Sequence, residues 1–229
     1  MVGESGVDAE FRALERELGN LGLGGVDTNL EALGQHRAAI LLWNQRVNLV
    51  SRRDEKKLIR YHFLDCAEGL THLREGTDRR VLDLGSGAGF PGVVWKILRP
   101  DLDITLVDSI RKRALFLESV VEALGLEGVG IVRERGEELA EREDFAGQYD
   151  VGVARTVAPL WRLVGVCMPF LRPGGRLLAF KGRAVEEELA EAESVLKDKG
   201  GKLVRVAPAR SETLRGKRIF VVIEKKAGL

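Results

Sequence analysis

The chain divides into two parts according to the spacing of its apolar residues. Residues 9–18 carry a short amphipathic pattern. After about residue 28 the apolar positions recur with helical spacing, as in Leu30, Leu33 and Ile40, and no strand pattern appears before residue 75. This pattern predicts a helical region over residues 1–75. The spacing changes after that point, which predicts a second domain over residues 76–229.

In the second domain, short apolar runs alternate with amphipathic helical segments. Short runs bounded by glycine, proline or acidic residues are typical of buried strands. The predicted strands cover residues 81–85, 104–107, 129–132, 149–154, 176–180, 203–207 and 219–223. The predicted helices between them cover residues 93–98, 111–124, 160–171 and 185–199.

This alternation predicts an α/β fold, because strands that alternate with helices form a parallel sheet covered on both faces. The last two strands have no helix between them, so we expect them to be joined as an antiparallel pair. The expected architecture is a Rossmann-like domain with a seven-strand, mostly parallel sheet and an antiparallel final strand, plus an N-terminal helical subdomain.

Composition limits the class of partner. The 229 residues include 36 basic and 35 acidic side chains, so a nucleic acid would have to be held by a local basic face. The two cysteines, Cys66 and Cys167, lack metal or disulfide spacing and are expected to be buried free thiols. No apolar run approaches the roughly 20 residues of a membrane span, and no signal pattern opens the chain. We therefore expect a soluble, cytoplasmic protein with no membrane partner.

The most informative stretch is a glycine loop after the first predicted strand. The spacing Gly85-x-Gly87-x-Gly89 follows an acid in the strand, Asp83. Phe90 stands where a dinucleotide-binding loop has its third glycine. The acid and the phenylalanine disfavour a pyrophosphate and suit a ligand with an amino-acid head. The loop resembles the first motif of class I S-adenosylmethionine methyltransferases.

An acid after the second predicted strand supports this interpretation. Asp108 ends that strand, and a carboxylate at this place can accept both hydroxyls of an adenosine ribose. The expected cofactor is therefore S-adenosyl-L-methionine, and no metal is expected.

Longer stretches point to one family. They are LLWNQRVNLVS, YHFLDC, DLGSGAGFPGVVWKILRPDLDITLVDSIRKRALFL, RERGEEL, VARTVAPL and RPGGRLLAFKG. Together they resemble the bacterial small-subunit ribosomal RNA guanine-N7 methyltransferases, the RsmG or GidB family, over about residues 41–223. The resemblance implies methylation of N7 of a specific guanine in 16S ribosomal RNA, as free RNA or in the 30S particle.

The resemblance also implies a set of site residues. Asp108 would lie beside the ribose, and Arg155 would lie where cofactor and guanine meet and would position the reactants. The implied cofactor-binding residues are Gly85, Gly87, Gly89, Phe90, Asp108, Gly136, Glu137 and Arg155.

The loop after the fourth predicted strand agrees with this chemistry. Exocyclic amine methylation usually calls for an Asn/Asp-Pro-Pro-aromatic loop, whereas this loop is Arg155-Thr156-Val157-Ala158 and holds no cysteine nucleophile. Guanine N7 has an exposed lone pair and needs no general base. We expect in-line transfer without a protein nucleophile, with a rate that comes mainly from positioning. His62 is expected to be a hydrogen-bonded structural histidine.

Basic residues near the carboxyl ends of the strands form a candidate RNA face. They are Arg52, Lys112, Arg113, Arg135, Lys181 and Arg218. Three other functions remain open at this point. The chain could methylate a small molecule or a protein, it could be a nucleotide- or RNA-binding module without turnover, or it could be a nicotinamide-dependent oxidoreductase. Phe90 disfavours the last of these, and the intact glycine loop with Asp108 disfavours the second.

Overall fold

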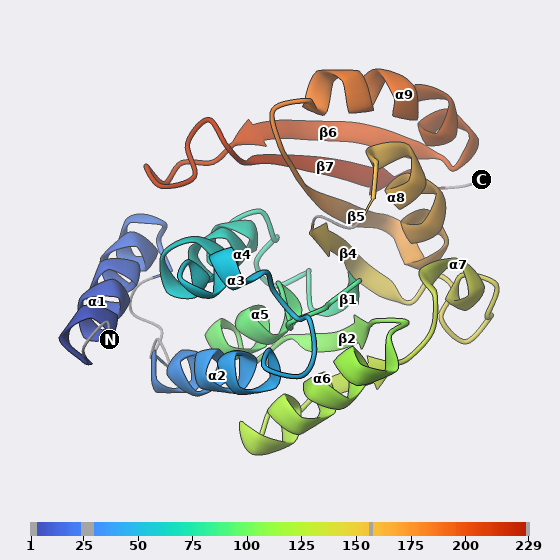
Figure 1. The fold of residues 1–229 in the computed structure, drawn as a ribbon. Coiled ribbons are helices and arrows are strands. Elements are labelled where there is room, and N and C mark those ends of the chain that lie inside the picture. The colour runs from blue at the N-terminus through green and yellow to red at the C-terminus, as the bar shows by residue number, and fades with distance from the viewer. Residues whose placement is uncertain (1–3, 24–29, 156–157, 228–229) are drawn as a thin grey trace.

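A computed structural model describes residues 4–23, 30–155 and 158–227 (Figure 1). Within these ranges, no helix has the length and hydropathy needed to cross a membrane.

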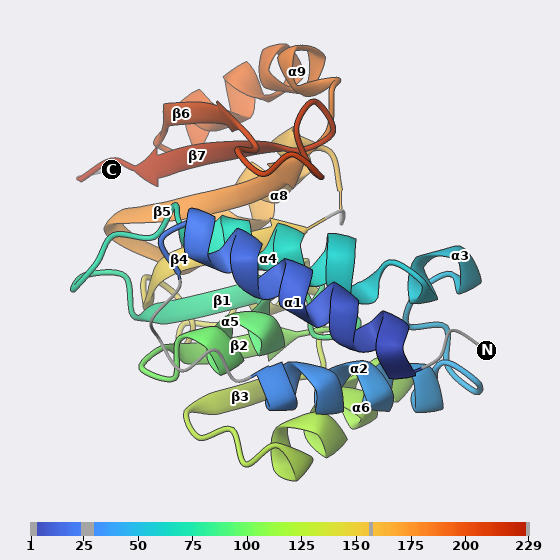
Figure 2. The same ribbon diagram turned by 90° about the vertical axis from the view of Figure 1, so that its left-hand side faces the viewer.

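Among the described residues, the part of the chain before the sheet is mostly helical, as predicted. They are α1 (Glu4–Asn20), α2 (Leu30–Trp43), α3 (Arg52–Glu55), the π-helix η1 (Leu58–Phe63) and α4 (Leu64–Leu70). Ser51 caps α3, where its hydroxyl accepts a hydrogen bond from the Asp54 amide at 3.2 Å. Figure 2 shows α1, α2 and α4 on one side of the sheet, where their apolar faces join the core beneath them.

Seven strands form one twisted sheet in the order β3-β2-β1-β4-β5-β7-β6. Their bounds are β1 (Arg80–Leu84), β2 (Asp103–Val107), β3 (Val129–Val132), β4 (Tyr149–Arg155), β5 (Leu171–Lys181), β6 (Gly201–Pro208) and β7 (Ile219–Lys225). Strand β7 runs antiparallel to both of its neighbours, and the pairs from β3 to β5 are parallel. The predicted Rossmann-like sheet with an antiparallel final strand is confirmed.

The remaining helices cover both faces of the sheet. They are α5 (Gly92–Leu98), α6 (Arg111–Ala123), α7 (Gly136–Leu139), α8 (Leu160–Cys167), the 3-10 helix η2 (Met168–Phe170) and α9 (Val185–Asp198). Helix α5 is buried along its whole length. It lies between the sheet and α4, and the Trp95 indole donates to the Cys66 carbonyl at 2.6 Å. Because α4 and α5 share this contact, the N-terminal helices and the sheet are parts of one continuous core.

One predicted boundary is wrong. The helix expected over residues 160–171 ends at Cys167, and β5 begins at Leu171, well before the expected residue 176. Leu171 already pairs with Tyr149 of β4, and the register then shifts so that Arg176 pairs with Val151. The Pro-Gly-Gly sequence at 173–175 is therefore an irregularity inside the strand and does not separate the strand from the preceding helix.

Candidate cofactor site and the residues behind it

The glycine loop turns sharply between β1 and α5 and is bonded to the end of β2. Gly85, Gly87 and Gly89 have φ values of 77°, 55° and 81°, which side chains with a Cβ rarely adopt. The amides of Gly85 and Ser86 both donate to the Val107 carbonyl, at 2.8 and 3.0 Å. These bonds hold the loop against the residue that follows β2, Asp108.

Asp108 fixes the loop and borders an open pocket. Its Oδ2 accepts a hydrogen bond from the Gly87 amide at 3.0 Å, and its Oδ1 accepts one from the Ile110 amide at 2.9 Å. The Arg113 guanidinium lies 3.7 Å from Oδ2. The predicted ribose-binding carboxylate thus lies at the carboxyl end of β2, where ligands bind in open α/β sheets.

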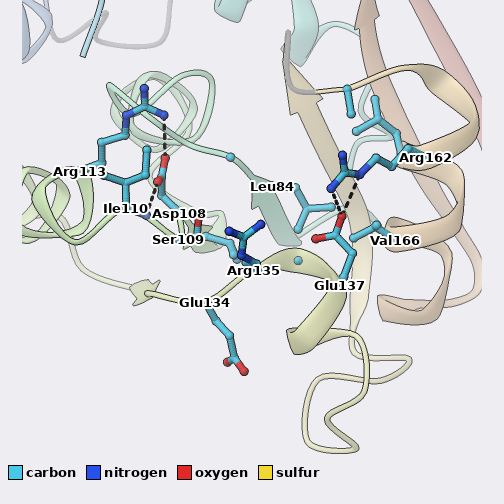
Figure 3. Close-up of a pocket in the computed structure, with 15 residues that line it drawn as sticks. Leu84, Asp108, Ser109, Ile110, Arg113, Glu134, Arg135, Glu137, Arg162 and Val166 are labelled. Atoms are coloured by element: carbon cyan, nitrogen blue, oxygen red, sulfur yellow. Dashed lines mark hydrogen bonds and ion pairs between the residues drawn. The ribbon is translucent and has the colours of Figure 1, made fainter. Parts of the chain in front are cut away.

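The pocket has a volume of about 240 Å³ and lies between the ends of β1, β2 and β3 and the helices α7 and α8. Figure 3 shows Asp108 with Arg113 on one side and Glu137 with Arg162 on the other. The Arg162 Nη2 donates to Glu137 Oε1 at 2.6 Å and holds the pKa of Glu137 below its usual value. Of the predicted cofactor residues, the pocket lining includes Gly85, Asp108, Gly136 and Glu137.

The pocket and the strand leading into it suit a cationic amino acid joined to a nucleoside. The pocket offers three carboxylates, those of Asp108, Glu134 and Glu137, among apolar side chains such as Leu84 and Val166. Asp83 is fully buried, its Oδ2 accepts from the Gly92 amide at 2.9 Å, and its Oδ1 has no hydrogen-bond partner within the described ranges. Burial raises the Asp83 pKa to about 7.

Arg155 ends β4 and is almost fully buried. Its Nε donates to Asp65 Oδ2 at 2.7 Å, and its Nη2 lies 2.6 Å from His62 Nδ1. Its guanidinium carbon lies 5.4 Å from the centre of the Phe90 ring. The structure therefore brings together Arg155 and Phe90 of the predicted site, although neither lines the 240 Å³ pocket.

His62 is hydrogen-bonded, as predicted. Its ring stacks on Phe90 with centroids 5.5 Å apart and an interplanar angle of 7°. Burial, together with the charge of Arg155, lowers the pKa of His62 to about 4. The imidazole is therefore neutral at pH 7, and Nδ1 can accept the hydrogen bond from Arg155.

The predicted RNA-binding residues fall into two groups. Arg52, Lys112 and Arg135 are exposed, and the half-buried Arg113 borders the pocket with Arg135.

Lys181 and Arg218, in contrast, are buried. The Lys181 Nζ donates to Glu188 Oε2 at 2.6 Å and to the Ala158 carbonyl at 2.7 Å. Arg218 donates from Nε to Asp65 Oδ1 and from Nη2 to Asp65 Oδ2, both at 2.7 Å. RNA contact by these two residues stays a prediction.

Two acids that hold these cations were not predicted, Asp65 and Glu188. The signal for Asp65 was an acid within the apolar helical stretch Phe63-Leu64-Asp65-Cys66, where a charge is unusual unless it is paired. Glu188 sits in a run of glutamates at the start of α9, and nothing in that run distinguishes it. Thr156 and Val157, which belong to the predicted loop after β4, lie outside the described residues.

The described residues hold no group of three or more His, Cys, Asp or Glu side chains placed to bind a metal ion. Cys66 and Cys167 are buried free thiols, as predicted.

Comparison with solved structures shows the fold. A SAM-dependent methyltransferase from Aquifex aeolicus matches with a TM-score of 0.57 at 18% identity, and the match covers 77% of this chain and 99% of that one. A mutant of MtNAS in complex with S-adenosylmethionine matches with a TM-score of 0.55 at 15% identity, over 95% of this chain and 78% of that one.

Comparison of sequences shows the family. The family model of GidB, rRNA small subunit methyltransferase G, matches residues 29–215. The ribosomal RNA small subunit methyltransferase G of Symbiobacterium thermophilum is 39% identical over 93% of this chain and 89% of its own length. That of Roseiflexus castenholzii is 38% identical over 85% of this chain and 83% of its own length. This chain therefore belongs to the rRNA small subunit methyltransferase G family.

Proposed function

We propose that this chain transfers a methyl group from S-adenosyl-L-methionine to N7 of a guanine in small-subunit ribosomal RNA. The observation that carries the proposal is the pocket between Asp108 and Glu137, with the buried cation Arg155 at the end of the neighbouring strand. The family membership and the names of the relatives and structural neighbours support the same cofactor and substrate. When bound, the cofactor supplies a methyl group on a positively charged sulfur.

The carboxylates and the glycine loop account for the cofactor's place. Asp108 is proposed to accept the ribose hydroxyls, and Gly136 with Glu137 to lie beside the adenine. Gly85, Gly87, Gly89 and Phe90 are proposed to shape the side of the site where the amino-acid part lies. A side chain at position 136 would meet Val166 Cγ1 at 2.9 Å, so only glycine leaves this wall of the pocket as it is.

The protonation states near the site fit a reaction without a protein nucleophile or base. Burial raises the pKa of both Cys66 and Cys167, the latter to about 12, so neither thiol ionises at neutral pH. His62 is neutral, and its Nδ1 already faces Arg155. Guanine N7 needs neither group because its lone pair is free to attack in line with the methyl–sulfur bond. The rate would then come from alignment of the two reactants.

The methylated product tests the function. Labelled methyl should pass from S-adenosylmethionine to small ribosomal subunits from cells that lack this activity, and nucleoside analysis should yield 7-methylguanosine. Free 16S RNA in a parallel reaction tells whether the assembled particle is needed. If the chain binds the cofactor but labels neither the small subunits nor the free 16S RNA, the proposal is contradicted. A small molecule or a protein would then be the substrate.

The exposed cations Arg52, Lys112 and Arg135 and the half-buried Arg113 are proposed to contact RNA phosphates. About four phosphate contacts on single-stranded RNA would give a slope near −3 in a plot of log affinity against log salt concentration. Affinity should then fall roughly 50-fold between 50 and 200 mM salt, measured by filter binding. Lys112→Ala should make this slope shallower by about 0.7, which is the contribution of one phosphate contact on a single strand. A slope near zero would contradict this RNA face.

We also propose that the chain works in the cytoplasm. The two free thiols support a reducing compartment.

A further inference from the structure

The end of β4 meets helix α4 in a buried ionic cluster built around one carboxylate. Asp65 is fully buried and accepts three hydrogen bonds at 2.7 Å, one from Arg155 and two from Arg218. Its partners are 90 and 153 residues away in the chain. A single acid in α4 therefore joins the end of β4 to the residue that precedes β7.

The same cluster fixes the plane of the Arg155 guanidinium. Asp65 holds its Nε, and His62 Nδ1 lies 2.6 Å from its Nη2. The Phe90 ring lies against both groups, stacked on His62 and facing the guanidinium. Because a guanidinium is planar, partners at two of its nitrogens and a ring beside it determine its orientation as well as its position.

Stability alone does not account for such a cluster. Removal of charged groups from water offsets most of their mutual attraction, so well-packed apolar residues of similar size are often as stabilising as a buried ion pair. This cluster also lies at the carboxyl end of β4, the edge of the sheet at which ligands bind in open α/β folds.

We propose that Asp65 and His62 are positioning residues for methyl transfer, which act by holding the Arg155 guanidinium in its working orientation. The proposal rests on the proposed function, because that function is what assigns Arg155 the positioning of the reactants. Neither residue touches the reacting atoms. Their contribution is the fixed geometry of Arg155, and loss of that geometry lowers the turnover number more than it changes the KM for the cofactor.

Asp65→Asn is the first test, because asparagine keeps the size of the side chain and removes its charge. A misplacement of catalytic geometry by about 1 Å can cost as much as 100-fold, so a fall in kcat of at least about 10-fold is expected. The KM for S-adenosylmethionine should change much less. Methyl transfer to small subunits is measured at a temperature at which thermal unfolding shows that the wild-type protein and the Asp65→Asn variant are both folded.

Glu68→Gln is the matched control. Glu68 lies one turn further along the same face of α4 and is also almost fully buried. Its Oε2 accepts from the Ser211 hydroxyl at 2.8 Å, and its carboxylate also accepts from the amides of Arg210 and Ser211 on the loop before β7. This variant should lose stability as Asp65→Asn does and keep the wild-type kcat. An equal loss of kcat in both variants would mean that Asp65 affects activity only through stability and is not a positioning residue.

His62 provides a second test that does not remove a buried charge. His62→Ala removes the acceptor and the stacked ring, whereas His62→Asn keeps an oxygen that can accept from the Arg155 Nη2. We expect His62→Ala to lower kcat by several-fold or more and His62→Asn to restore part of it. Wild-type kcat in folded Asp65→Asn and His62→Ala would overturn the proposal. A wild-type chain that transfers no methyl is a separate outcome, which would end the proposed function itself.

Discussion

Replacement of Arg155 by alanine is expected to lower methyl transfer by about 100-fold or more while the chain stays folded and still binds part of its cofactor. The loss of rate follows from the place of Arg155 at the end of β4, where its guanidinium is held by Asp65 and His62. The fold should survive because Asp65 keeps both hydrogen bonds from Arg218 and is not left as an unpaired buried charge. Rates of label transfer, thermal unfolding and cofactor titration measure the three effects separately.

A matched control for this variant is Arg176→Ala. Arg176 lies in the neighbouring strand β5, in register with Val151 of β4, and donates to Glu224 at 2.9 Å. It lies in the middle of β5 rather than at the carboxyl end of the sheet, so its loss should leave methyl transfer unchanged. Full activity of Arg155→Ala would exclude the positioning role of Arg155 and, with it, that of Asp65 and His62.

Replacement of Asp108 by alanine is expected to raise the Kd for S-adenosylmethionine by at least about 100-fold. The carboxylate accepts hydrogen bonds from the amides of Gly87 and Ile110, so its loss loosens the glycine loop as well as the proposed ribose contact. Each hydrogen bond to a charged group contributes a net stabilisation of about 1.5–3 kcal/mol, so the loss of two of them corresponds to a factor of about 100 or more in Kd. Isothermal titration with the cofactor measures the change directly.

Asp103→Ala is the control for the Asp108 variant. Asp103 begins the same strand and is exposed, so the two acids differ in which end of β2 they occupy. Its replacement should leave the cofactor Kd within about two-fold of the wild-type value, as for most surface changes. An unchanged Kd in Asp108→Ala would mean that the pocket described here is not the cofactor site.

Most of the fold was predictable because local sequence determines it. The strands around Leu82, Leu106 and Val153 are short apolar runs between turn residues, and each occupies its predicted place in the sheet. The start of β5 was not predictable from such patterns. Leu171 belongs to the sheet because Tyr149 of β4 lies beside it, and the Pro-Gly-Gly turn signal concealed this pairing.

The site was predictable only in part. The glycine loop and Asp108 have a fixed spacing along the chain, so sequence motifs locate them. Lys181 and Arg218 were predicted to belong to an RNA-binding face at the carboxyl ends of the strands. Both are buried, since Glu188 and Asp65 compensate their charges, and the second of these acids is 153 residues from its partner. Contacts between such distant residues have no signature in a single sequence.

The place of β7 has a consequence for the order in which the chain becomes active during its synthesis. Strand β7 inserts between β5 and β6, both of which precede it in the chain, and Arg218 stands directly before it. A nascent chain that lacks residues 218–225 has a gap in its sheet and an Asp65 without its two bonds from Arg218. The pocket proposed to bind the cofactor, in contrast, is lined by residues between 84 and 166. Every residue that lines this pocket is therefore synthesised before the residues that complete the support of Arg155.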